Sequence, residues 1–388
     1  MTLEPPSDLL NRLFLRAVAV ADPMQSLAQH LPPKPAGRVV VIGAGKASAR
    51  MAEAVEAEWG ACEGLVITRY GYARPCQGIR IVEAAHPVPD AAGLAATADM
   101  LDLLSGLGAD DYVLALISGG ASSLLIAPAG DITLAEKQAV NAALLASGAP
   151  IDRMNALRKH LSRVKGGQLA AAAYPAQMLA LMISDVPGDD PAFIGSGPTV
   201  GDAATTADAR LSRVENRIYA APAQSLDAAA ELARDAGIKV QILGDAIEGE
   251  ARDIAASHAA LALKLQAGRG PDAPPLLLLS GGELTVTRRG DGIGGPNAEY
   301  CLALAIALGG AAGIHALACD TDGVDGAAEV AGAVIGPDTL MLAHNHGIDP
   351  QQALARNDAH RFFAAIDRQV ITGPTLTNVN DFRAILVE

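Results

Sequence analysis

Short apolar runs rich in branched residues alternate with longer Ala-rich segments through much of the chain. Because such runs between helical segments are typical of buried strands, we expect strands in the first half at 38–43, 65–68, 79–84, 112–118 and 178–184. The Ala-rich segments between them predict helices. Strands that alternate with helices form a mostly parallel sheet covered on both faces, so the sequence predicts an α/β fold.

The alternation continues in the second half. A strand is expected at 239–243 and a helix at about 248–266, and the Gly and Pro content of 267–275 marks a linker. Beyond it we expect a second domain with a two-stranded hairpin, a helix and a further strand, at 276–280, 284–289, 297–308 and 314–319. The sequence therefore divides into domains 1–266 and 276–388.

Neither of the long apolar segments predicts export or a membrane span. Residues 9–21 contain two arginines, which favours an amphipathic helix beginning near Ser7 or Asp8 over a signal peptide. Residues 301–319 carry no formal charge, but three glycines divide them into helix, turn and strand. The four cysteines stand at no metal-ligand spacing, which favours a reducing compartment. We therefore expect a cytoplasmic protein without a membrane partner.

Charge and length narrow the class of partner. The 388 residues suffice for two domains with separate cores. Lys and Arg total 29 against 43 Asp and Glu, a formal net charge of −14, which disfavours nucleic acid as a partner. A small-molecule ligand is expected instead. The oligomeric state stays open, with a homodimer as the assembly to test.

Two apolar runs break into the same Ser-Gly-Gly sequence, at 118–120 and 280–282. In open α/β sheets ligands bind beyond the carboxyl ends of strands, where glycine lets backbone N–H groups approach an anion. Plain turn chemistry is the alternative. Two such loops, one in each domain, favour a ligand held between the domains, and the candidate residues are Ser118, Gly119, Gly120, Ser122, Ser123, Ser280, Gly281, Gly282 and Glu283.

The first strand ends in Gly43-Ala44-Gly45-Lys46, which is neither a complete dinucleotide fingerprint nor a Walker A loop. The next strand ends in Thr68-Arg69, without the carboxylate that would hold a ribose hydroxyl. Lys46 at a strand-to-helix turn is well placed to meet a phosphate or carboxylate. Because a cation at a helix N-terminus opposes the helix dipole, a bound anion would explain it, although a solvated lysine is the alternative.

Acidic loops follow two other predicted strands. Clustered carboxylates at strand ends can hold Mg²⁺ or accept a proton from a hydroxyl, and solvated Asp-Gly turns are the alternative. One loop supplies Asp185, Asp189 and Asp190, and the other supplies Asp320, Asp322 and Asp325.

Residues 158–170 concentrate positive charge in an otherwise acidic chain and are expected to form one helix. Such a helix favours an anionic ligand over a solvated face, and its candidate residues are Lys159, His160, Arg163 and Lys165. Together with the glycine-rich loops, Lys46 and the acidic loops, it suggests phosphoryl transfer to a small acidic substrate.

The chain resembles glycerate 2-kinase of the MOFRL type, some members of which are also labelled hydroxypyruvate reductase. The resemblance runs from about residue 8 to the C-terminus and rests on VIGAGKAS, HPVPD, LISGGASSLL, RKHLSRVKGGQLA, SDVPGDDPAFIGSGPT, LLLSGGE, DTDGVDG and TGPTLTNVND. It implies a larger N-terminal domain with a Rossmann-like parallel sheet and a smaller C-terminal MOFRL domain, with the active site in the cleft. It also implies an ATP- and Mg²⁺-dependent conversion of D-glycerate to 2-phosphoglycerate.

On this resemblance we expect a phosphotransferase with an alcohol group as acceptor. The expected catalytic residues are Lys46, Asp185 and Asp189, and the expected metal ligands are Asp320 and Asp322. The expected substrate or nucleotide ligands include Lys159, Lys165, Asn297 and Glu299 besides the loop residues named above.

The chain departs from the family pattern at two positions. Pro296 stands where the family usually has an arginine, and Leu376 stands where glycine is common. Three other activities stay open: an NAD(P)H-dependent hydroxypyruvate reductase, a kinase for a related short sugar acid, and a catalytically silent sugar-acid sensor.

Overall fold

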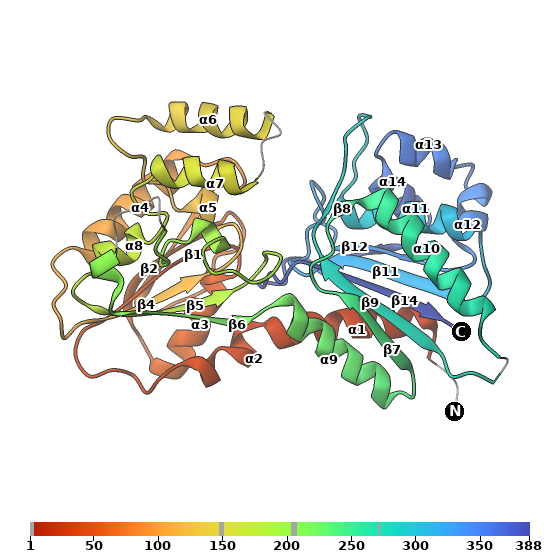
Figure 1. The fold of residues 1–388 in the computed structure, drawn as a ribbon, viewed down its shortest axis with the longest axis horizontal. Helices are drawn as coiled ribbons and strands as arrows, with labels where there is room; N and C mark the ends of the chain where they lie inside the picture. Colours follow the sequence, from red (N-terminus) through yellow and green to blue (C-terminus); the bar gives the residue numbers. More distant parts are fainter. Residues whose placement is uncertain (1–3, 147–150, 203–207, 271) are drawn as a thin grey trace. The chain divides into compact units, whose positions relative to one another are not determined.

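The computed structural model describes residues 4–146, 151–202, 208–270 and 272–388 (Figure 1). Contacts divide the chain into two compact units. The described residues of Asp22–Ala221 and Leu376–Asn378 form one, called here the N-terminal unit. The described residues of Met1–Ala21, Pro222–Thr375 and Val379–Glu388 form the other, the C-terminal unit.

The N-terminal unit contains a six-stranded parallel sheet with the order β3-β2-β1-β4-β5-β6. Its strands are β1 (Val39–Ala44), β2 (Glu63–Arg69), β3 (Ile79–Ala84), β4 (Tyr112–Ile117), β5 (Gln177–Ile183) and β6 (Val214–Ala220). The first five confirm the strands expected from the sequence. The order reverses between β1 and β4, and such a switch point is where ligands of doubly wound sheets bind.

Helices cover both faces of this sheet (Figure 1). On one face, Ile42 and Ala115 share an apolar cluster with Met100 and Leu169. The alternate residues of the strands point to the opposite face, where α3 packs against β1, β2 and β4. The helices of the unit are α2 (Pro23–Ser26), α3 (Ser48–Trp59), α4 (Ala91–Leu104), α5 (Ala121–Leu124), α6 (Leu134–Ala146), α7 (Ile151–His160) and α8 (Gln168–Ala172).

The expectation of one basic helix over 158–170 is wrong. Helix α7 ends at His160 and α8 begins at Gln168. Between them Gly166 and Gly167 adopt φ of 58° and 80°, a left-handed conformation that ends helices. Lys159 and His160 therefore lie on α7, whereas Arg163 and Lys165 lie in the connecting segment.

The C-terminal unit contains a six-stranded mixed sheet with the order β13-β12-β11-β14-β9-β7. All its neighbouring strands are antiparallel except β7 and β9. The strands are β7 (Lys239–Gly244), β9 (Leu276–Gly282), β11 (Ile314–Asp320), β12 (Gly332–Ile335), β13 (Gln369–Val370) and β14 (Asp381–Val387).

The hairpin expected from 276–280 and 284–289 does not form. Both edges of β9 are already paired, one with β14 and the other with β7. The chain beyond β9 instead gives a short strand β10 (Leu284–Thr285), which pairs in parallel with β8 (Gly249–Glu250).

Helices cover this second sheet on both faces as well. On one face α10 (Ala251–Ala267) and α11 (Pro296–Leu308) share a core with α12 (Thr339–Asn345), α13 (Pro350–Ala355) and α14 (Ala359–Ala365). On the other face α1 (Pro6–Ala21) and α9 (Pro222–Asp235) pack together, and the rings of Phe14 and Phe382 lie 5.9 Å apart.

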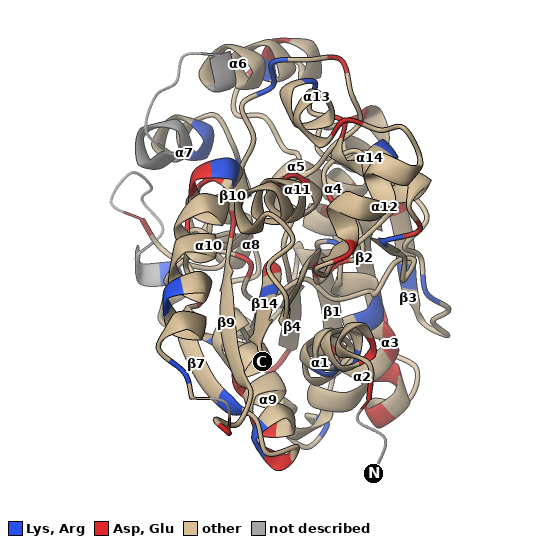
Figure 2. Cartoon of the chain, turned by 90° about the vertical axis from the view of Figure 1, so that its right-hand side faces the viewer, with Lys and Arg blue, Asp and Glu red and all other residues tan. Residues whose placement is uncertain are grey.

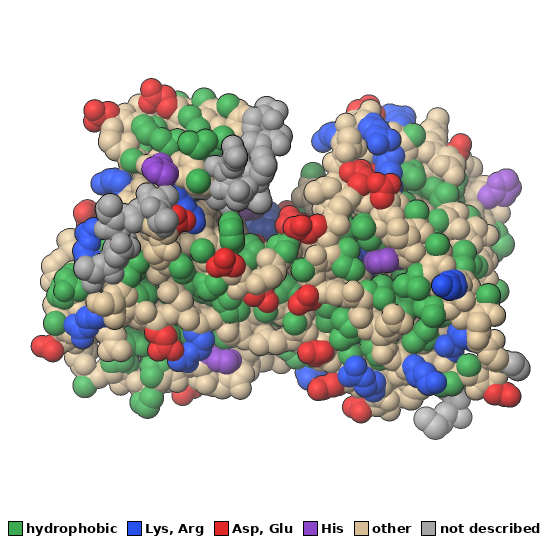
Figure 3. All heavy atoms as spheres, viewed as in Figure 1, with side chains coloured by type: hydrophobic (Ala, Val, Ile, Leu, Met, Phe, Trp, Pro, Cys, Tyr) green, Lys and Arg blue, Asp and Glu red, His purple; other side chains and the backbone are tan. Residues whose placement is uncertain are grey.

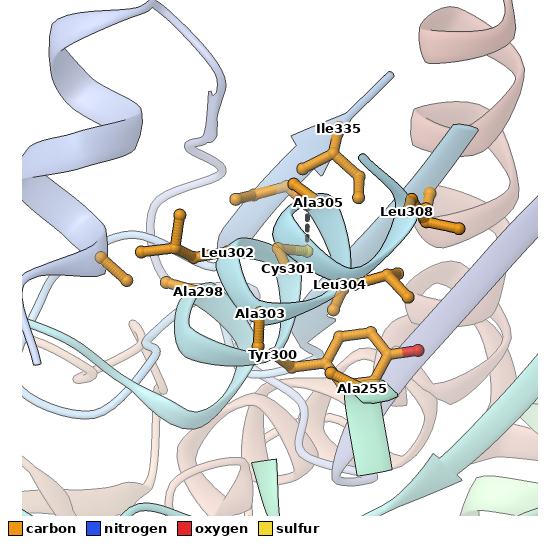
Figure 4. Packing of buried hydrophobic residues seen from close by; sticks show 14 of the residues in the cluster. Ala255, Ala298, Tyr300, Cys301, Leu302, Ala303, Leu304, Ala305, Leu308 and Ile335 are labelled. Carbon is orange, nitrogen blue, oxygen red and sulfur yellow. Dashed lines mark hydrogen bonds between the residues drawn. The ribbon is translucent and has the colours of Figure 1, made fainter. Parts of the chain in front are cut away.

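Helix α11 is buried over most of its length, and Figure 4 shows Tyr300, Cys301, Leu302 and Leu304 pointing in different directions into the packing around it. The expected helix, turn and strand over 301–319 are confirmed. Within the described ranges, no helix combines the length and apolar character needed to cross a membrane.

The compact units differ from the ranges 1–266 and 276–388 expected from the sequence. Helix α1 and residues 222–266 belong to the C-terminal unit, because α1 and α9 cover one face of its sheet. The expected linker connects α10 to β9 inside that unit, and its Pro271 lies outside the described residues. As boundaries of sequence domains, the two ranges stay a prediction.

Candidate active site

Three strand-end loops of the N-terminal unit meet at the switch point of its sheet. Lys46 follows β1 and directly precedes the N-cap residue of α3. Residues 118–120 follow β4, and Asp185 lies in the loop after β5. The backbone N–H of Lys46 donates to the carbonyl oxygen of Gly119 at 2.8 Å, so the first two loops are joined directly.

The glycines of these loops allow close packing between loops. A Cβ at Gly45 would collide with Ser118 Oγ, and a Cβ at Gly119 would collide with the carboxylate of Asp185. A Cβ at Gly43 would lie 2.5 Å from the carbonyl oxygen of Leu116. The glycine pattern that suggested a phosphate cradle therefore has a structural cause at these positions.

Ser118 is part of the same packing. Its side chain is 0% exposed, and its Oγ accepts a hydrogen bond from the backbone N–H of Ala47 at 3.0 Å and lies 3.2 Å from Ser48 Oγ. The hydroxyl therefore fixes the loop that carries Lys46.

Lys46 and His86 flank Gly120. Gly120 has φ of 82°, and a Cβ built on it would lie 3.0 Å from His86 Cδ2 and 3.3 Å from Lys46 Cγ. The side chain of Lys46 is half-buried. His86 begins the HPVPD motif but was not among the residues expected to bind a ligand, because its place beside Gly120 depends on the fold.

The loop after β5 brings two carboxylates to the same end of the sheet. Asn378 Nδ2 donates to Asp185 Oδ2 at 3.1 Å, over Gly119. Asp189 has a positive φ of 53°, and its buried Oδ1 has no hydrogen-bond partner. A strained backbone and an unsatisfied buried oxygen are features that cluster at functional sites.

A cavity of about 300 Å³ lies beside Gly120. It contains three of the residues expected from the first Ser-Gly-Gly loop and one from the basic segment, namely Gly120, Ser122, Ser123 and Lys165. Four further polar residues complete its lining: His86, Lys137, Asn141 and Arg158. The rest is apolar, formed by Pro87, Val88, Pro89, Ile126, Val140, Leu144 and Leu161. The lining residues that the structure describes include neither Asp nor Glu.

Two cations of this cavity, Lys165 and Lys137, contact neutral oxygens. Lys165 is 2% exposed and its Nζ donates to the carbonyl oxygen of Ser122 at 2.6 Å and to Ser122 Oγ at 3.1 Å. Lys137 Nζ donates to the carbonyl oxygen of Leu161 at 2.9 Å, and Arg158 Nε donates to Asn141 Oδ1 at 3.0 Å.

Burial and mutual repulsion act on the ionisation of these groups. Burial lowers the pKa of Lys165 well below its ordinary value, and the nearby charges of Lys137 and Arg158 lower it further. The pKa of Lys137 is lowered by burial and then by Arg158. An anion in the cavity would relieve this repulsion.

Lys159 is not in the lining. Its ammonium pairs with the carboxylate of Asp202 and lies 5.8 Å from the ring centroid of Phe193, so its charge is already neutralised. The structure therefore separates Lys159 from Lys165, which the sequence had placed on one helix.

In the C-terminal unit, the second Ser-Gly-Gly sequence is the end of strand β9. Arg383 reaches across it, with Nε 3.3 Å from Ser280 Oγ and a hydrogen bond to the carbonyl oxygen of Gly281. A Cβ at Gly282 would collide with the backbone of Ile247. These atoms are engaged within the unit, and Glu283 lies between β9 and β10.

Arg383 also pairs with a buried carboxylate that the sequence did not single out. Its Nη1 donates to Asp381 Oδ2 at 2.9 Å, and burial raises the pKa of Asp381 to about 6. Asn297 Nδ2 donates to Asp381 Oδ1 at 2.7 Å. Asn297, expected as a ligand, thus contacts a buried network.

The acidic turn after β11 is held by its own backbone. Asp320 Oδ1 accepts from the N–H of Asp322 at 2.9 Å, and Asp322 Oδ1 accepts from the N–H of Val324 at 2.8 Å. Asp325 accepts from the N–H groups of Asn297 and Ala298. Over the part of the chain that the structure describes, no three His, Cys, Asp or Glu residues are grouped so that they could hold a metal ion.

Comparison with known proteins gives matches to both halves of the chain. Residues 9–229 match a domain of unknown function, DUF4147, and residues 276–381 match the MOFRL family. A D-glycerate 2-kinase from Thermotoga maritima is 36% identical, and the match covers 96% of each chain. A protein from Agrobacterium vitis, provisionally named a hydroxypyruvate reductase, is 50% identical over 98% of this chain and 94% of its own.

A solved structure is similar over nearly the whole length. The crystal structure of a glycerate kinase from Thermotoga maritima matches with a TM-score of 0.89 and 34% identity, covering 98% of this chain and 99% of its own. The expected α/β fold with a parallel N-terminal sheet is confirmed by this match.

Proposed function

Because the chain belongs to the MOFRL-type glycerate kinase family, we propose that it transfers a phosphoryl group from ATP to the C2 hydroxyl of D-glycerate, giving 2-phosphoglycerate. The observation that carries this proposal is the likeness to a D-glycerate 2-kinase over 96% of both chains. Phosphoryl transfer requires positioning and charge stabilisation more than covalent chemistry.

The N-terminal unit offers the groups for this task. Lys46, at the switch point and beside Gly120, is the cation assigned to the transferring phosphoryl group. Ser122, Ser123 and Lys165 supply donors for anionic oxygens at the cavity. Lys159 and the C-terminal residues Ser280, Gly281, Asn297 and Glu299 are engaged internally, which supports a structural role for them.

The acceptor hydroxyl must lose its proton to a nearby base, and Asp185 and Asp189 are the candidates. Asp189 is preferred, because its Oδ1 is buried and has no partner, whereas Asp185 Oδ2 accepts a hydrogen bond from Asn378. Asp185 and Asn378 would then hold the loop after β5 in place beside Gly119.

Magnesium enters this proposal as the MgATP complex. Mg²⁺ in kinases is held by one or two carboxylates together with nucleotide phosphates, so a site of three protein ligands is not required. Asp320 and Asp322 are the carboxylates assigned to the metal, and they are two residues of one turn that is held by its own backbone. Bound Mg²⁺ supplies charge neutralisation. We expect EDTA to stop turnover and excess MgCl₂ to restore it, and an undiminished rate in EDTA would remove the metal from the proposal.

The reductase reading has one supporting observation, the provisional name of the relative from Agrobacterium vitis. Against it stands the end of β2 at Thr68 and Arg69, without the carboxylate that holds a ribose hydroxyl in nicotinamide enzymes. Oxidation of NADH or NADPH in the presence of hydroxypyruvate, followed by absorbance, distinguishes the two activities.

The decisive experiment is ADP release from MgATP over a panel of short hydroxyacids, with identification of the product. We expect D-glycerate to give the fastest rate and 2-phosphoglycerate to be the product. Formation of only the 3-phospho isomer contradicts the proposal, and ligand binding without ADP release would indicate a silent sensor. A faster rate with another acid would make the protein a kinase for that acid.

The proposal includes a cytoplasmic location, supported by four free cysteines in a chain without the spacing of a disulfide framework. It includes neither nucleic acid nor a membrane as partner, in line with the net charge of −14. A homodimer is the assembly to test by light scattering.

A further inference from the structure

We propose that the cavity beside Gly120 is the nucleotide site, with the polyphosphate on Lys137, Arg158 and Lys165 and the base at the apolar mouth. The choice of a nucleotide rests on the proposed kinase activity, whereas the anionic character of the ligand rests on the cavity alone. The sequence left open which Ser-Gly-Gly loop faces ATP, and this proposal selects the first.

Charge is the first step toward this assignment. Among the residues that the structure describes, three cations and no carboxylate line the cavity. Lys165 and Lys137 donate only to neutral oxygens. Like charges held together in a partly buried site repel one another unless an anion joins them. A polyphosphate carries several negative charges and matches three cations better than a single carboxylate does.

The positions of the cations and of the apolar residues indicate how a bound ligand is oriented in the cavity. Lys165 is 2% exposed, whereas Val88 and Val140 of the same lining are 60% and 37% exposed. The ammonium of Lys165 is therefore deep in the cavity, whereas Val88 and Val140 lie at its mouth. Figure 3 shows hydrophobic side chains exposed along α6, the helix that carries Val140, and Figure 2 shows the basic end of α7 in blue.

This direction suits a nucleotide better than the acceptor. A nucleotide places its charged phosphates at one end and a flat, largely apolar base at the other. D-Glycerate carries an oxygen on each of its carbons, so it has no group for an apolar mouth. A cavity of about 300 Å³ also lies at the lower end of the range for ligands of drug size.

The test is calorimetric titration of the full-length protein with ADP, with pyrophosphate and with D-glycerate as separate probes. Lys137→Gln and Arg158→Gln each remove one charge from the cavity. We expect each to weaken ADP and pyrophosphate by about 10- to 100-fold, as for the loss of a hydrogen bond to a charged group, and to leave D-glycerate unchanged. Val140→Asn should weaken ADP about fivefold and leave pyrophosphate unchanged.

Two matched variants keep the test specific. Arg80→Gln removes a cation from an exposed pair with Asp99 outside the cavity and should leave all three affinities unchanged. Lys137→Arg keeps the charge and should retain ADP affinity within about threefold. Thermal midpoints within a few degrees of the wild type would show that the variants are folded.

Several outcomes would overturn the assignment. A loss of D-glycerate affinity with ADP affinity unchanged would make the cavity the acceptor site, and unchanged binding of every probe would exclude the cavity as a ligand site. If the wild-type protein binds ADP through these residues but forms no phosphoglycerate, the proposed kinase activity is wrong. The assignment of the cavity as a nucleotide site would still hold.

Discussion

Replacing Glu299 by Gln removes one negative charge and one hydrogen-bond acceptor from a buried position at nearly constant volume. Glu299 is 0% exposed, its Oε1 accepts from Arg252 Nε at 2.6 Å, and its Oε2 accepts from Asn357 Nδ2 at 2.9 Å. Both oxygens are thus engaged inside the C-terminal unit. We predict that Glu299→Gln lowers the stability of the protein without changing its kinetic constants.

The magnitude follows from the hydrogen bonds that remain. The amide of Gln offers one acceptor oxygen for two donors. Asn357 cannot turn its own amide to compensate, because its Oδ1 accepts from the backbone N–H groups of Arg289 at 2.7 Å and Gly290 at 3.0 Å. One donor therefore loses its partner, at about 1.5–3 kcal/mol for a bond to a charged group. At about 2–4 °C per kcal/mol, the thermal midpoint should fall by about 3–12 °C.

Thermal unfolding followed by circular dichroism measures the midpoint, and kcat and KM for D-glycerate and ATP are measured well below it. Glu231→Gln is the control, because Glu231 is exposed on α9 and its loss should change stability by less than about 0.5 kcal/mol. A Glu299→Gln variant with the thermal midpoint of the wild type and a raised KM would refute the structural role. Such a result would indicate that Glu299 binds a ligand, as the sequence suggested.

Three further predictions concern the N-terminal unit. Lys46→Ala should lower kcat by about 10²- to 10³-fold, with a thermal midpoint within a few degrees of the wild type. Lys46→Arg should also lower the activity. Wild-type kinetic constants for Lys46→Ala would show that Lys46 is a surface residue without a role in the reaction. Leu376 has φ of 63°, a left-handed conformation that glycine adopts more easily than alanine. The Leu376→Gly variant should therefore be more stable than the Leu376→Ala variant by about 0.5–1 kcal/mol, measured by urea unfolding. Equal stabilities of the two variants would argue against backbone strain at this position. The groups around Lys165 are Lys137, Arg158, Ser122 and, elsewhere in the lining, His86. Because burial and the two cations lower the pKa of Lys165, bound ADP should raise that pKa, so that binding takes up protons and weakens as the pH rises. Calorimetry in two buffers measures the proton uptake, and an affinity for ADP that does not change with pH would contradict the prediction.

The parallel sheet could be predicted because its strands are buried on both faces. The residues of β1 are all buried, and a strand of this kind gives a continuous apolar run. The edge strand β6 was not predicted, because Glu215 and Asn216 are exposed and interrupt the pattern. An edge strand with polar residues cannot be told from a loop by hydrophobicity alone.

The second sheet was harder to predict for a different reason. Strand β14 lies in the middle of that sheet and is buried throughout, yet it contains Asp381 and Arg383. These two charges are buried because they pair with each other, which no local pattern indicates. Strand β9 pairs with β14, about a hundred residues further along the chain, instead of with the segment that directly follows it. The expected local hairpin therefore does not form.

The candidate site was predicted in part. Several candidates come from motifs that are visible in the sequence. Lys46 lies at the switch point, and the cavity is lined by Gly120, Ser122, Ser123 and Lys165. Lys137 was not singled out, because a lone cation on a helix is ordinary, and Arg158 begins the basic segment 158–170 but was not named as a candidate. Only the packing of α6 and α7 beside the first loop brings them into one cavity.

Position 296 shows that the two units use charge differently. Pro296 is the first residue of α11, a position where proline costs no hydrogen bond. Asp325 accepts from the N–H groups of Asn297 at 2.9 Å and Ala298 at 2.8 Å, so a carboxylate of the same unit caps this helix start. No arginine is present there to meet a phosphoryl group.

The cavity of the N-terminal unit has the complementary arrangement, in which the described lining residues supply cations rather than carboxylates. Its lining includes Lys137, Arg158 and Lys165 and, over the described ranges, no carboxylate, and Lys46 lies beside Gly120, which borders the same cavity. Phosphoryl transfer depends on positive charge held where negative charge develops, whichever residue supplies it. Four cations around one loop can supply that charge, so the proline at 296 is compatible with a working kinase whose nucleotide is held by the N-terminal unit.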